Sequence, residues 1–178
     1  GFVAAISPGS AARVANAFYE DDEAVVWACA DVLREEYKRI TDAGLTVQID
    51  APDIAEGWDQ MNPEPSVEDY RAFSRVRIDA LNHALEGIDP SLVRFHVCWG
   101  SWHGPHTTDI AFKDIVDLAL LVNANGLTFE AANARHAHEW TIWRDTPLPE
   151  GKYLIPGVVS HSTNVVEHPE LVTQRIRQ

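Results

Sequence analysis

Residues 94–100, Arg94-Phe95-His96-Val97-Cys98-Trp99-Gly100, form a short apolar run that predicts a buried strand. Side chains at alternate positions of a strand point to the same face. We therefore expect His96 and Cys98 to project side by side near the end of this strand. An imidazole and a thiol together suit zinc, whereas a buried cysteine by itself is usually only a small apolar residue.

Helical segments alternate with short apolar strands along the rest of the chain. Further strands are predicted at residues 2–6, 45–49, 126–130 and 153–159. Helices are predicted at residues 21–44, 66–87 and 110–122, with a last one that begins at residue 168. Acidic residues open the first of these helices, and Ser66 with Asp69 resembles a capping box at the start of the second. This alternation predicts a parallel sheet with crossover helices, an α/β fold.

Polar side chains collect where the predicted strands end, which is where parallel α/β folds place ligand sites. These residues are Ser7, Asp50, His96, Cys98, Glu130 and His161. Glu130 suits three roles: a metal ligand, an acid–base group, or an ion-pair partner of Arg135. Asp50 either braces its loop or anchors a cationic group or hydroxyl of a ligand. Trp99 is either part of the core or an aromatic wall that stacks on a flat ligand.

Composition limits the classes of partner. The 178 residues carry a net charge of −13, which argues against binding to nucleic acid or to an anionic membrane. No apolar run reaches the length of a membrane span, and no secretory leader is evident. The two cysteines, Cys29 and Cys98, do not suggest a disulfide framework. We expect a cytoplasmic protein with reduced thiols.

Five segments, in their order and spacing, resemble the C-terminal catalytic barrel of cobalamin-independent methionine synthase. They are residues 6–9, 47–52, 95–98, 128–130 and 155–159. Residues 99–106 and 130–133 are more similar to a branch of that family with epoxyalkane:coenzyme M transferase and uncharacterised methionine synthase II proteins. The resemblance implies a TIM-type (β/α)8 barrel. On this mapping residues 1–178 form a single partial barrel domain, truncated at both ends, with about strands 3 to 7 of 8.

The resemblance also implies a zinc site, with His96, Cys98 and Glu130 as ligands and a further cysteine that has no counterpart up to Gln178. Asp50 matches an aspartate that holds the amino group of homocysteine, but Ala51 stands where the family has a glutamate, so other thiols remain open. His161 lies one position from the family's proton-donating histidine. Ser7 and Trp99 are expected to contact the substrate.

The leading hypothesis is a zinc-dependent enzyme that transfers a methyl or other alkyl group to a small-molecule thiol. The default pair is 5-methyltetrahydropteroyltriglutamate and homocysteine, in methionine biosynthesis. One alternative keeps the zinc but joins an epoxide to coenzyme M. Another is a catalytically inactive barrel fragment that serves as a binding or assembly module. Because an open sheet has two unpaired edges, we expect association with a second copy or with the missing barrel segments.

Overall fold

The computed structural model describes residues 1–101 and 106–178, so Trp102 and His103 of the segment 99–106 lie outside the described residues. The described part contains one parallel sheet, whose strands are paired in chain order. The strands are β1 (Phe2–Ile6), β2 (Thr46–Ala51), β3 (Val93–Val97), β4 (Gly126–Glu130) and β5 (Tyr153–Gly157). The predicted α/β class with a parallel sheet is therefore confirmed.

The helices include the long α2 (Asp22–Asp42) and α4 (Val67–Ala84). Asp21 Oδ1 accepts a hydrogen bond from Ala24 N at 2.8 Å, and Ser66 Oγ accepts one from Asp69 N at 3.0 Å. Both caps satisfy backbone donors that a helix start leaves free. The remaining helices are α1 (Pro8–Ala11), α3 (Glu56–Asp59), η1 (Pro90–Leu92), η2 (Phe112–Asp114), α5 (Val116–Ala119), η3 (Ala137–Arg144) and α6 (Pro169–Arg177).

The helix predicted at residues 110–122 is wrong as a continuous element, because the structure forms only η2 and the short α5 there. Side chains from elsewhere in the chain bind backbone groups in and next to this segment. Glu139 Oε1 accepts from Phe112 N at 2.6 Å, and Trp99 Nε1 donates to Ile110 O at 3.0 Å. Asn82 likewise accepts from Asn123 N at 2.7 Å. These contacts hold the segment in short turns.

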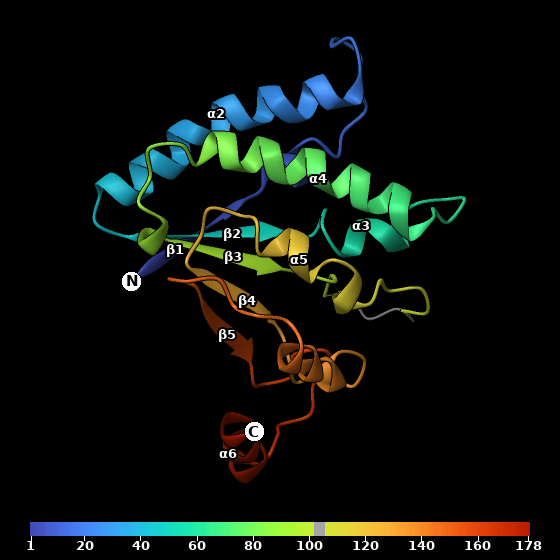
Figure 1. Ribbon diagram of the computed structural model, residues 1–178, viewed down its shortest axis with the longest axis vertical. Coiled ribbons are helices and arrows are strands. Elements are labelled where there is room, and N and C mark those ends of the chain that lie inside the picture. The colour runs from blue at the N-terminus through green and yellow to red at the C-terminus, as the bar shows by residue number, and fades with distance from the viewer. Residues whose placement is uncertain (102–105) are drawn as a thin grey trace.

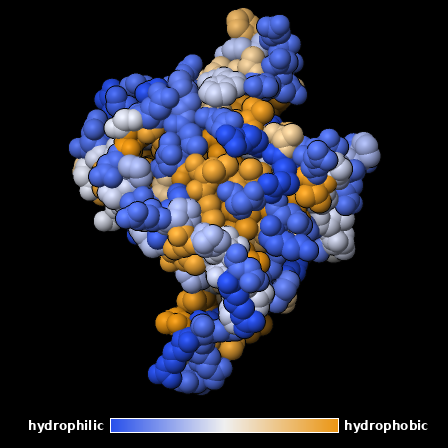
Figure 2. All heavy atoms as spheres, in the orientation of Figure 1, coloured by the Kyte–Doolittle hydropathy of each residue, from blue (hydrophilic) through white to orange (hydrophobic). Residues whose placement is uncertain are grey.

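The order of the strands determines where the helices lie. Each crossover advances one strand in the same direction along the sheet. Because parallel crossovers are right-handed, this order places the connecting helices on one face. Figure 1 shows α2 and α4 side by side along this face, with α5 close to them. Figure 2 shows hydrophobic atoms gathered near the centre of the same view, around α5 and the strands.

Strand residues alternate between this covered face and the opposite one. Val47, Ile49, Val93 and Phe95 are buried in the core beneath the helices. We call the opposite side the inner face. On its three central strands it carries Gln48 and Asp50 of β2, Arg94, His96 and, just past the strand, Cys98 of β3, and Thr128 and Glu130 of β4. The inner face therefore carries four of the polar side chains that the sequence places at the strand ends: Asp50, His96, Cys98 and Glu130.

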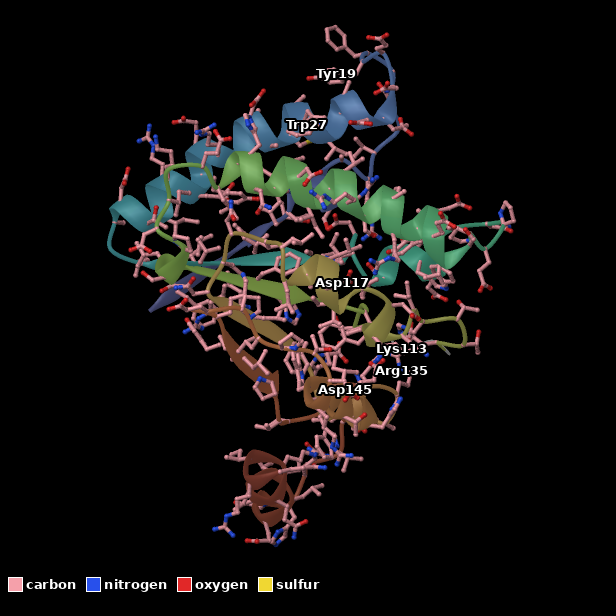
Figure 3. All side chains as sticks on the ribbon, viewed as in Figure 1. Tyr19, Trp27, Lys113, Asp117, Arg135 and Asp145 are labelled. Carbon is pink, nitrogen blue, oxygen red and sulfur yellow. The ribbon has the colours of Figure 1, made fainter. Side chains whose placement is uncertain are left out.

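Polar contacts join the helices to each other and to the sheet. Arg71 on α4 forms an ion pair with Asp117 on α5 at 2.6 Å, and Figure 3 labels Asp117 at this junction. Tyr37 on α2 donates to the carbonyl oxygen of Ile6 at 2.5 Å, where β1 ends. Among the described helices, none is both long enough and apolar enough to cross a membrane.

Candidate metal centre

Three side chains on the inner face form a group of metal-ligand type. Asp50, His96 and Cys98 each offer one ligand atom, and these atoms lie within 4.8 Å of one another. Strands β2 and β3 pair with Asp50 directly opposite His96, and Cys98 follows two residues later on the same face. A carboxylate oxygen, an imidazole nitrogen and a thiolate are ligands that zinc accepts, and three protein ligands leave its fourth position open.

The carboxylate of Asp50 supports this interpretation. Its Oδ1 atom is buried and has no hydrogen-bond partner within the described residues. A buried carboxylate oxygen without a partner is costly, since it has lost its water and gained no donor. A divalent cation between Asp50, His96 and Cys98 would satisfy this oxygen. The donor set and the unpaired oxygen therefore both fit a bound metal.

His96 is fixed in orientation by a neighbour on β4. Its Nδ1 atom lies 2.5 Å from Thr128 Oγ1, and the register of β3 and β4 places these two residues opposite each other. This contact leaves Nε2 as the nitrogen free to bind a metal. Burial lowers the pKa of His96 and outweighs the opposing charges of Asp50 and Glu130. The ring is thus kept in the neutral form that binds metals.

The thiol of Cys98 is held in its protonated form by its surroundings. Burial raises its pKa from 9.0 to about 11, and the hydrogen bond from Gly100 N to Sγ at 3.4 Å offsets this only in part. The charges of Asp50 and Glu130 raise the pKa further. A cation at this position would reverse the effect, because a coordinated thiol loses its proton.

Glu130 lies on the inner face but outside the group within 4.8 Å. The register pairs His96 with Thr128, so that Glu130 stands two residues further along β4. The ion-pair interpretation of Glu130 fails, because the Arg135 guanidinium instead contacts Asp109; Figure 3 labels Arg135 near η3. The carboxylate that meets the ligand distance is that of Asp50, and coordination by Glu130 stays a prediction.

A cavity of about 320 Å³ lies on the inner face, and both Glu130 and His161 border it. His161 belongs to the loop that follows β5. Glu167 accepts a hydrogen bond from Ser160 N at 2.8 Å and pairs with Arg175 of α6 at 2.7 Å, which ties this loop to the helix. The cavity is lined by Phe2, Gln48, Arg94, His96, Thr128, Phe129, Glu130, Ala132, Asn133, Ile155, Pro156, Gly157, Val159, Ser160, His161 and Ser162.

Ser7 and Trp99 are not among the described residues that line this cavity. The hydroxyl of Ser7 donates to Asp53 Oδ1 at 2.5 Å and caps α1. Trp99 is fully buried and stacks on the His136 ring with centroids 4.1 Å apart. Substrate contact by these two residues stays a prediction, and their partners in the structure give both a packing role.

A cluster of charged groups beside Trp99 was not predicted from the sequence. His136 lies 2.7 Å from Glu139 and 3.3 Å from Asp109, and Asp109 also contacts His106 at 3.0 Å. Burial alone would lower the pKa of His136, but the hydrogen bonds to Asp109 and Glu139 outweigh it and the pKa is raised. The three-residue spacing of His136 and Glu139 was the signal available in the sequence.

Comparisons with known proteins add no relative: no family model matches the chain, and no curated protein matches its sequence. The functional conclusion therefore depends on the chemistry of Asp50, His96 and Cys98 and of the cavity beside them.

Proposed function

We propose that the protein is a zinc-dependent enzyme that transfers a methyl or other alkyl group to a thiol. The observation that carries this proposal is the group formed by Asp50, His96 and Cys98, with ligand atoms within 4.8 Å of one another. The unpaired Oδ1 of Asp50 supports it. The proposal includes the barrel: parallel strands in chain order, with helices on one face, are compatible with part of a (β/α)8 barrel.

A zinc ion at this site would bind the acceptor thiol and favour its thiolate at neutral pH. The thiolate sulfur attacks the alkyl carbon of the donor and forms a carbon–sulfur bond. The bond from that carbon to its nitrogen or oxygen breaks, and the electron pair goes to the leaving atom. We assign His161, which borders the same cavity, as the group that gives this atom its proton.

The default substrates of this proposal are 5-methyltetrahydropteroyltriglutamate and homocysteine. A second pair, an epoxide and coenzyme M, is favoured by the position of Asp50. A carboxylate that coordinates zinc is not free to hold the amino group of homocysteine, and coenzyme M has no amino group. The position of Asp50 within the ligand group therefore supports an acceptor without an amine.

An Asp50→Asn variant separates these roles of Asp50. If Asp50 is a metal ligand, the variant loses zinc and turnover with both acceptor thiols. If Asp50 only holds an amino group, turnover with homocysteine falls while zinc content and turnover with coenzyme M persist. Unchanged zinc and unchanged turnover with both thiols would remove Asp50 from the site.

The direct test of the proposal is metal content, measured by elemental analysis of the purified chain and two variants. We expect about one zinc per chain in the unmodified protein. Cys98→Ser should lose it, whereas Cys29→Ser should keep it, because Cys29 lies on α2, outside the ligand group. Absence of zinc from all three proteins would overturn the proposal and favour the inactive binding module.

A further inference from the structure

The cavity on the inner face contains a cation that the proposed chemistry does not use. Arg94 lies two residues before His96 on β3 and lines the same cavity. Within the described residues no carboxylate forms an ion pair with it, and its Nε atom is buried without a hydrogen-bond partner. The guanidinium lies over the Phe2 ring, with Cζ 4.8 Å from the centroid. A half-buried guanidinium in this position has hydrogen-bonding capacity for a ligand.

The surroundings of Arg94 leave room for such a ligand and carry no charge of their own. In the sheet Arg94 stands between Gln48 of β2 and Gly126 of β4. A Cβ at position 126 would come within 3.1 Å of Arg94 Cγ, so that glycine gives the Arg94 side chain its space. The acidic residues Asp50 and Glu130 lie further along their strands. The inner face is thus cationic at Arg94 and acidic near the strand ends.

Asn133, which also lines the cavity, supplies a second donor. Its Oδ1 accepts hydrogen bonds from Arg135 N at 2.9 Å and His136 N at 2.8 Å, which fixes the orientation of the amide. Nδ2 is consequently directed away from these donors, and it is buried without a partner in the described structure. The residue is only 5% exposed and borders the cavity. Two residues that line the cavity, Arg94 and Asn133, thus each carry a buried nitrogen donor without a hydrogen-bond partner in the described structure.

We infer that Arg94 forms an oxyanion subsite, which binds the carboxylate or sulfonate of a small ligand whose other end reaches His96. Alternate residues of a strand are about 6.6 Å apart, a distance that a short carbon chain spans. Guanidinium groups bind such oxyanions through two parallel hydrogen bonds. The subsite itself rests on Arg94 and Asn133. The identity of the ligand's other end as a thiol rests on the proposed function.

The test compares two thiols of matched length, mercaptopropionate and propanethiol, on cobalt-loaded protein. The absorption band of a cobalt-bound thiolate reports binding without any turnover. We expect mercaptopropionate to bind at least about tenfold more tightly, since a charge-assisted hydrogen bond contributes that much. Arg94→Met should abolish this preference. Arg75→Met is the matched control, because it removes the same charge from an exposed ion pair on α4.

Equal binding of the two thiols to the unmodified protein, or a preference that survives in Arg94→Met, would overturn the subsite. A second titration uses propionate, which has no thiol, and follows the NMR shift of the Arg94 Nε–H group in metal-free protein. An NMR shift with propionate but no cobalt–thiolate band would support the subsite and contradict the proposed function. A cobalt–thiolate band of equal strength for both thiols would support the proposed function and contradict the subsite.

Discussion

Replacement of Thr128 by valine tests how the site orients its histidine. Valine keeps the shape of threonine but removes the hydroxyl that lies 2.5 Å from His96 Nδ1. Thr128 is only 8% exposed, so that water does not readily replace the lost group. Loss of a partner that orients a metal-binding histidine weakens metal affinity by roughly 10- to 100-fold. A buried donor left without an acceptor also costs about 1–3 kcal/mol of stability.

Zinc affinity is measured by competition with a coloured chelator, and stability by urea unfolding of the metal-free protein. Thr128→Ser is the matched control, because it retains the Oγ atom and should hold zinc within a few-fold of the unmodified chain. The hydroxyl has no orienting role if Thr128→Val remains folded and binds zinc as tightly as Thr128→Ser. Equal loss of affinity in both variants would assign the effect to packing around β4.

Two further predictions concern regions away from the metal centre. Gly9→Ala should destabilise the fold by about 1–3 kcal/mol, because its Cβ would overlap the Asp53 carboxylate and lie 2.7 Å from Arg77 Cγ. Urea unfolding measures this loss of stability. Gly157→Ala is the control, because the nearest atom to its Cβ would be 3.3 Å away. His136 has a raised pKa, so its stabilising effect is complete below 6.5 and is lost as pH rises through the raised value. The difference in melting temperature between the unmodified chain and His136→Gln should therefore shrink from pH about 6 to about 8, and a constant difference would refute the assignment.

Much of the architecture follows from local sequence signals. The caps at Asp21 and Ser66 mark the starts of α2 and α4, and short apolar runs mark the strands. The failure at residues 110–122 has a different origin. There Trp99 and Glu139, distant in sequence, bind backbone groups of Ile110 and Phe112. Local periodicity carries no information about such long-range partners, so it predicts a helix where the chain forms turns.

The choice between Asp50 and Glu130 as the carboxylate beside His96 and Cys98 also depends on long-range information. Both acids lie at or next to the last residue of a strand that pairs with β3, and alternation places both on the inner face. Only the register separates them: β2 places Asp50 opposite His96, whereas β4 places Thr128 there and Glu130 two residues later. A sequence pattern determines which face of the sheet a side chain occupies, but not which residue of the neighbouring strand lies opposite it. The types of side chain in this group were therefore predictable, and which carboxylate lies within 4.8 Å of the His96 and Cys98 ligand atoms was not.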